Sequence, residues 1–252
     1  MTRSFVLSAL LACRTDPRPL SQGQWVWTSG DAAAVEERRR TEPEVVALVL
    51  IGELSFDGEE IRTALRNSPT VVRAPRGVVV RPDDSVASAF AGRSDAELAA
   101  ALDAPLGRLL AQAEQVGGPP DEVQLDFDCP VRLLPRWGEV VGLLERGALR
   151  ERHPWVTSLV AHVTDPTFAP ALHERVEGHV LQVFDTGDRA VDADEVGRAA
   201  AAAKMRYRLG VGTFERQRDG VQVTDHRAWL EQVDRACLPP WCIGVDRFGA
   251  QR

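Results

Sequence analysis

Eight short apolar runs alternate with segments of helical pattern, and this alternation constrains the fold more than any other feature of the chain. Each run is rich in β-branched or aromatic residues and is bounded by turn formers, as buried strands are. Strands alternating with helices indicate parallel βαβ units. The predicted strands span residues 24–28, 45–56, 70–80, 123–128, 156–163, 179–184, 208–214 and 242–248, and the predicted helices span 31–42, 57–67, 95–116, 132–147, 167–176, 192–206 and 227–237.

Strand number and chain length together favour one α/β domain, a compact (β/α)8 TIM-type barrel over residues 24–252. A doubly wound open sheet is the alternative, but it usually has fewer strands. Only one glycine, Gly30, follows the first strand, so the dinucleotide fingerprint is missing. Three helix starts carry capping residues, namely Asp57, Ser94 and Asp192. The polar stretch 81–94 is expected to be an insertion after the third strand.

The first residues have the pattern of an export signal. Arg3 precedes an apolar run over 5–12, which is too short to span a bilayer. Cys13 follows this run as it would in a bacterial lipobox, so we expect a signal peptide at 1–12 and a lipid-anchored tether at 13–23. The alternative is an ordinary signal, or a buried N-terminal helix, with a chance cysteine. The lipobox interpretation predicts a bacterial envelope lipoprotein that faces the periplasm and meets the membrane only through its lipid.

Charge and cysteine content narrow the partners. The net charge is -7 and no basic stripe is present, so we expect no nucleic-acid binding. Beyond Cys13 the chain has Cys129, Cys237 and Cys242, without the histidine spacing of a zinc site. We therefore expect no metal and no cofactor. Export would allow a disulfide between Cys237 and Cys242, although spacing alone does not establish it. The sequence does not determine the oligomeric state.

The fourth predicted strand carries the clearest candidate site. Side chains alternate along a strand, so Gln124, Asp126 and Asp128 share one face, while the apolar residues between them share the other. The apolar face suits packing against helices, which leaves the polar face pointing into the barrel. Two carboxylates two residues apart raise each other's proton affinity. Because active sites of such barrels form at the carboxyl ends of the strands, we expect the catalytic centre here.

A purely structural role is the alternative for these aspartates. In that case Asp126 and Asp128 would be neutralised by arginines such as Arg73, or would cap the following helix. His162, on the fifth strand, has apolar neighbours and is expected to be a satisfied core residue.

Other predicted strands contribute polar and aromatic residues to the same site. Indole rings are good stacking surfaces for sugars, although core packing is their commoner role. Together these residues resemble a carbohydrate site more than a phosphate or nucleotide site. The candidates for catalysis are Asp185 and Glu215, in addition to the two aspartates, and the candidates for substrate binding are Trp25, Trp27, Arg73, Gln182 and Trp241.

The order of these segments resembles the domain of unknown function 3142 family of uncharacterised bacterial proteins. The residues that carry the resemblance are the segment 124–130, the downstream strand 155–164 and the segment 178–184. The similarity spans most of the chain from Trp25 onward. It implies a barrel-like fold and no established activity.

A more remote similarity is to family 18 glycoside hydrolases, the chitinase-like barrels. Asp126 and Asp128 look like the last two aspartates of the fourth-strand motif of that family. Phe184 and Asp185 look like its Tyr-Asp pair on the sixth strand, and Trp241 lies near the position of its stacking tryptophan. The segment 209–214 is similar to the seventh strand of that family.

One departure from the chitinase-like motif matters for the chemistry. The resemblance places the general acid two residues beyond Asp128, where this chain has Pro130. Proline cannot transfer a proton, so Asp128, Asp185 or Glu215 would have to supply it. We expect a glycoside hydrolase-like barrel acting on a polysaccharide or cell-wall glycan, with Asp128 as acid, Asp126 tuning it and Asp185 orienting the substrate. The alternatives are a non-catalytic glycan-binding or envelope-assembly lipoprotein with a degenerate site, and an assembly partner recognised through its surface.

Overall fold

The computed structural model describes residues 20–152, 154–183, 192–212, 214–218, 221–225 and 231–249, and of 214–218 and 221–225 it describes the backbone. Parallel strands close into a barrel in the order β1-β11-β8-β7-β6-β5-β4-β2, and β2 pairs again with β1. The chain is therefore a (β/α)8 TIM-type barrel. The barrel strands are β1 (Ser21–Val26), β2 (Val46–Phe56), β4 (Arg76–Pro82), β5 (Val123–Leu125), β6 (Trp155–Leu159), β7 (Gly178–Gln182), β8 (Tyr207–Gly212) and β11 (Cys242–Phe248).

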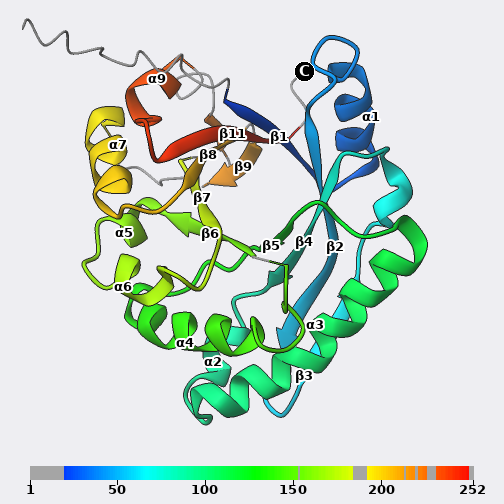
Figure 1. Ribbon diagram of the computed structural model, residues 1–252, viewed down its shortest axis with the longest axis vertical. Coiled ribbons are helices and arrows are strands. Elements are labelled where there is room, and N and C mark those ends of the chain that lie inside the picture. Colours follow the sequence, from blue (N-terminus) through cyan, green and yellow to red (C-terminus); the bar gives the residue numbers. More distant parts are fainter. Residues whose placement is uncertain are drawn as a thin grey trace, which may run out of the picture.

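Helices surround the strands on the outside of the barrel (Figure 1). Two predicted caps are confirmed: the Ser94 side chain accepts from the Glu97 backbone N–H, and Asp192 accepts from the N–H groups of Asp194 and Glu195. The helices are α1 (Ser29–Arg38), α2 (Val86–Ala89), α3 (Asp95–Gly117), α4 (Leu134–Leu144), α5 (Val160–Val163), α6 (Phe168–Leu172), α7 (Ala193–Ala202) and α9 (Val233–Ala236), with 3-10 turns η1 (Pro69–Val71) and η2 (Val131–Leu133).

The helix predicted at 57–67 is wrong, because this segment holds strand β3 (Ile61–Leu65), antiparallel to β2. β1 pairs with β2 only over Val46–Val49, which leaves the distal part of that edge without partners. Backbone groups need hydrogen bonds, and β3 supplies them from Gly52 to Phe56. Asp57 caps the turn, not a helix, by accepting from the N–H groups of Glu59 and Glu60.

Several other predicted boundaries are shifted. The third barrel strand begins at Arg76, not at residue 70, because the 3-10 turn η1 precedes it. The strand predicted at 156–163 ends at Leu159, where α5 begins. β8 ends at Gly212 and is followed by a hairpin of β9 (Phe214–Arg218) and β10 (Val221–Asp225). β1 begins at Ser21, inside the predicted tether, and residues 1–19 lie outside the described part of the chain.

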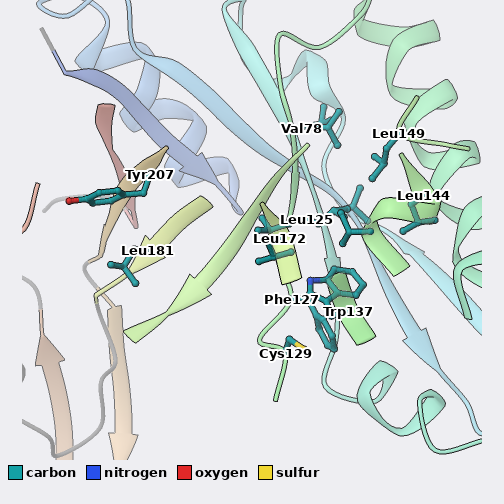
Figure 2. Packing of buried hydrophobic residues seen from close by; sticks show 14 of the residues in the cluster. Val78, Leu125, Phe127, Cys129, Trp137, Leu144, Leu149, Leu172, Leu181 and Tyr207 are labelled. Carbon is teal, nitrogen blue, oxygen red and sulfur yellow. The ribbon is translucent and has the colours of Figure 1, made fainter. Parts of the chain in front are cut away.

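Two apolar layers hold the barrel together. The larger lies between the strands and the helices, and Figure 2 shows Leu125 and Phe127 within it, close to Trp137 of α4. The rings of Phe127 and Trp137 meet edge to face with centroids 5.0 Å apart. The smaller layer lies inside the barrel and consists of Trp25, Leu48, Leu50, Val79, Trp155 and Val180.

The amino-terminal ends of β8 and β11 are fastened by a disulfide and a buried tyrosine. Cys237 and Cys242 are bonded, with Cα atoms 5.0 Å apart. The Tyr207 hydroxyl donates to the Ala236 carbonyl at 2.8 Å and accepts from the Leu238 N–H at 2.8 Å.

Among the described helices, none combines the length and apolarity that a bilayer crossing needs.

The contact between α4 and α6 yields a prediction for stability. A Cβ on Gly138 would lie 2.7 Å from the Ala171 carbonyl carbon, which is backbone and cannot move aside cheaply. Gly138→Ala should therefore lower the free energy of unfolding by about 1–3 kcal/mol. Gly107 in α3 is the matched control, because a Cβ there would lie 3.6 Å from Ala148 Cβ, an ordinary contact. Gly107→Ala should stabilise by about 0.4–1 kcal/mol. Urea denaturation measures both, and equal effects would contradict the packing argument.

Candidate active site at the barrel mouth

Strand β5 and its extensions carry a column of polar side chains inside the barrel. Gln124 is fully buried; its Oε1 accepts from Trp25 Nε1 at 2.9 Å, and its Nε2 donates to Glu122 Oε1 at 2.7 Å. The same Nε2 lies 3.4 Å from Asp246 Oδ2. Asp126 follows Gln124 on the same face. The column therefore runs from a floor at the amino-terminal ends of the strands to a mouth at their carboxyl ends.

The floor of the barrel is a buried ionic cluster. Arg208 forms an ion pair with Glu122, and its Nε lies 3.4 Å from Asp246 Oδ2. The guanidinium carbon lies 4.0 Å from the ring centroid of Trp155. Burial raises the pKa of Asp246 to about 6, although Arg208 opposes this shift. Since these groups balance one another's charge at the end opposite the mouth, we assign the cluster to the stability of the fold.

At the mouth, Asp126 occupies a nearly solvent-free position. It is 5% exposed, and its Oδ1 accepts from Gln182 Nε2, on β7, at 3.1 Å. Burial is the main reason that its pKa rises to about 6; Arg81 opposes the rise and the Asp128 carboxylate adds to it. A carboxyl group with this pKa holds a proton under mildly acidic conditions, as a general acid or its partner must.

Arg81, the last but one residue of β4, links both aspartates of the mouth. Its Nε lies 4.0 Å from Asp126 Oδ2, and its Nη2 lies 3.7 Å from Asp128 Oδ2. Its guanidinium carbon lies over the Trp27 ring, 5.0 Å from the centroid. The arginine that balances the aspartates is thus Arg81, not Arg73. Alternation could have found it, because Arg81 shares the inward face with Val79, but the predicted strand ended at residue 80.

Buried hydrogen bonds hold the loop after β5 in place. His162 Nδ1 accepts from the Leu159 N–H at 3.1 Å, and its Nε2 donates to the Cys129 carbonyl at 2.7 Å. The Phe127 N–H donates to Thr157 Oγ1 at 3.1 Å. His162 is a satisfied core residue, as its apolar neighbours predict, and burial lowers its pKa. Burial also raises the pKa of the Cys129 thiol to about 12, so this cysteine is not a nucleophile.

The candidate substrate-binding residues fall into two groups. Trp27 is half-buried at the mouth, where its ring meets Phe248 edge to face at 5.1 Å, whereas Trp25 is buried inside the barrel. Arg73 and Trp241 were expected near the same site, but they precede β4 and β11 and therefore lie at the opposite end of the barrel. A residue before a parallel strand cannot reach the carboxyl end of that strand.

Three predicted positions remain without a described side chain. Asp185 and Cys13 lie outside the described residues, and Glu215 lies in β9, of which the backbone is described. Within the described ranges, histidine, cysteine and carboxylate side chains form no group of three or more that could hold a metal ion.

Several solved structures share this fold, and a chitinase is among them. The chitinase RmChi1 of Rhizomucor miehei aligns with 90% of this chain and 93% of its own, with a TM-score of 0.60 and 10% identity. Concanavalin B aligns with 92% of this chain and 93% of its own, with a TM-score of 0.55 and 11% identity. The spore cortex-lytic enzyme SleL of Bacillus cereus has a TM-score of 0.55 and 11% identity over 86% of this chain, which spans 58% of the length of SleL.

At these identities the similarity establishes the fold and leaves the chemistry to the residues of the mouth. No protein-family model matches the chain, and no curated protein sequence matches it either. The fold and the site therefore define a (β/α)8 barrel with a pair of carboxylates at its mouth.

Proposed function

We propose that this protein acts on a polysaccharide or cell-wall glycan at the mouth of its barrel, as a glycoside hydrolase-like enzyme. The observation that carries the proposal is the pair Asp126 and Asp128 at the carboxyl end of β5, joined through Arg81 and positioned beside Trp27. Glycosidases need a carboxylic acid and a second carboxylate, or its substitute, near the bond that breaks. The chitinase-type barrel supports the same class of substrate.

The two aspartates suit different roles in this reaction. The Asp128 side chain is 38% exposed and can meet a substrate, whereas that of Asp126 is 6% exposed. We assign Asp128 as the acid that protonates the leaving glycosidic oxygen as the carbon–oxygen bond breaks. Water then adds at the sugar carbon and its proton returns to the carboxyl pair. Asp126 sets the proton affinity of Asp128, Asp185 orients the sugar, and Glu215 is the alternative acid.

Hydrolysis of a glycan panel tests this assignment. Wild-type protein should release reducing ends from at least one of chitin, peptidoglycan or a neutral polysaccharide. Asp128→Asn should lower the rate by about 10²–10⁴-fold, the usual contribution of a positioned acid. Asp234→Asn, at an exposed position on α9, is the control and should leave the rate unchanged. An Asp128→Asn variant with full activity would remove this residue from the mechanism.

A non-catalytic glycan-binding protein is the second candidate. Two observations favour it: Pro130 stands where the chitinase-like resemblance places a glutamate, and Arg81 lies within 4.0 Å of both aspartates. This candidate predicts retention on a glycan array with no turnover. Robust hydrolysis in the panel would reject it.

The remaining expectations concern location and family. We propose export through the signal at 1–12, lipid attachment at Cys13, and membership of the domain of unknown function 3142 family. The basis is the basic-then-apolar start and the lipobox pattern for export, and the segments 124–130 and 178–184 for the family. Mass spectrometry of the mature N-terminus would reveal the lipid. A free, unmodified Cys13 would reject the anchor.

A further inference from the structure

We infer that Arg81 is a positioning residue whose place over Trp27 is also the place that a stacked sugar needs, so that a bound glycan displaces the guanidinium and allows the aspartate pair to take up a proton. The inference rests on the proposed function for its ligand. It concerns an arginine that is not among the site residues predicted from the sequence or from the chitinase-like resemblance.

The position of Arg81 is the first support. The guanidinium lies over the indole at 5.0 Å, which is within the range of cation–π attraction. A sugar that stacks on Trp27 needs an open ring surface, and the same ring already meets Phe248 in a T-shaped pair with centroids 5.1 Å apart. Because guanidinium and sugar compete for the same indole, glycan binding and the removal of Arg81 are coupled.

The looseness of the ion pairs is the second support. The two nitrogen–oxygen distances of 4.0 and 3.7 Å exceed hydrogen-bond length, so Arg81 acts on both carboxylates through charge. Its side chain is 31% exposed, which gives it room to move toward solvent. Displacement therefore breaks no short hydrogen bond to either aspartate.

The charge balance of the mouth gives the consequence. Four described residues face the Asp126 carboxyl group. They are Arg81 of β4, Asp128 of the loop that follows β5, Thr157 of β6 and Gln182 of β7. Arg81 is the one cation in this set, and it favours the charged form of the carboxyl group. The Asp128 carboxylate also acts on His162 of α5, whose buried ring is neutral. Once Arg81 leaves, both burial and the like charge of the partner favour proton uptake from water.

The experiment separates the effect of the arginine from catalysis. Carboxyl carbon NMR signals of the aspartates are titrated in wild-type protein and in Arg81→Met, and Asp126→Asn identifies the Asp126 signal. Losing an opposite charge at this distance should raise the Asp126 midpoint by about 1–3 pH units. Arg62→Met, which removes an exposed arginine paired with Asp57 and Glu60 on the β2–β3 hairpin, should leave it unchanged. An unmoved midpoint in Arg81→Met overturns the inference.

Calorimetry with chitohexaose and with soluble peptidoglycan fragments tests the coupling. Binding to wild-type protein near pH 7 should take up protons, seen as a binding enthalpy that varies with the ionisation enthalpy of the buffer. In Arg81→Met the uptake should be smaller and the binding tighter, because no guanidinium has to leave the indole. Equal uptake by both proteins overturns the displacement step. Absence of binding to every glycan counts against the proposed function, while the NMR titration still decides whether Arg81 controls the pair.

Discussion

Replacing Arg208 by methionine should lower the free energy of unfolding at pH 7.5 by about 3–5 kcal/mol, since breaking a buried ion pair leaves uncompensated charge. The side chain of Arg208 is 5% exposed and faces both Glu122 and Asp246. Asp246 is fully buried, and within the described residues its ion-pair partner is Arg208. Methionine fills similar space and can still pack on Trp155. The loss of stability therefore measures the cost of burying the carboxylates of Glu122 and Asp246 without their cation.

Arg206→Met is the matched control for this experiment. Arg206 lies two residues before Arg208, just ahead of β8, and its guanidinium carbon lies 5.9 Å from the ring centroid of Trp155. Its side chain, however, is 50% exposed. Its pair with Glu177 is a surface pair, so the expected loss is below about 1 kcal/mol. Urea denaturation at pH 7.5 compares the two variants. Similar losses would show that the floor cluster contributes no more than a surface ion pair.

A lower pH should reduce the cost of Arg208→Met. At pH 5 Asp246 can bind a proton, which removes its charge, so the difference between the two variants should shrink. Adding Asp246→Leu to Arg208→Met should also recover part of the loss at pH 7.5, because an apolar group tolerates burial better than an unpaired carboxylate. A loss that does not change with pH would assign the effect to packing.

The second large effect is a dependence of folding stability on pH, to which two buried groups contribute with opposite signs. The pKa of Asp246 rises to about 6 in the folded protein, so its contribution to stability is present below the ordinary range of an aspartate and is lost as pH rises through 6. His179 acts in the other direction. Burial lowers its pKa to about 3, so unfolding takes up a proton below about 6.5 and stability falls as pH falls.

Single substitutions should expose these two slopes. Between about pH 4.5 and 5.5, Asp246→Asn should make stability fall more steeply with acidification, by about 1.4 kcal/mol per pH unit relative to wild type. His179→Gln should change the slope by a similar amount in the opposite direction. His179 Nδ1 lies 2.7 Å from Ser158 Oγ, and the side-chain amide of a glutamine can take the place of the imidazole in this hydrogen bond. Thermal unfolding over this range gives both slopes, and slopes equal to that of wild type would contradict the linkage.

Much of the fold could be predicted from strand–helix alternation. The wrong prediction of a helix at 57–67, where β3 lies, has a physical cause. Ile61 and Leu65 lie four residues apart, which fits a helical stripe, but they also fit one face of a strand. Only the unpaired edge of β2, a tertiary feature, decides between these possibilities. A local pattern cannot contain that information.

The candidate site shows the same limit. Alternation predicts that Asp126 faces inward, and the order of strands brings it to Gln182, two strands away in the barrel. Arg73 and Trp241 were misplaced because being near a strand was not distinguished from being at its carboxyl end. Arg81 was missed because the end of β4 was placed at residue 80, two residues too early.

The pairing of β1 with β11 has a consequence for how the chain reaches this structure. These strands are more than two hundred residues apart along the sequence, yet they are neighbours in the barrel. Until residues 242–248 are available, β1 and β8 each present an open edge on which another chain can add a strand. Contacts of such long separation form slowly. A ribosome-bound or truncated chain that stops before Cys242 should therefore depend on chaperones to stay unaggregated, whereas the closed barrel should not.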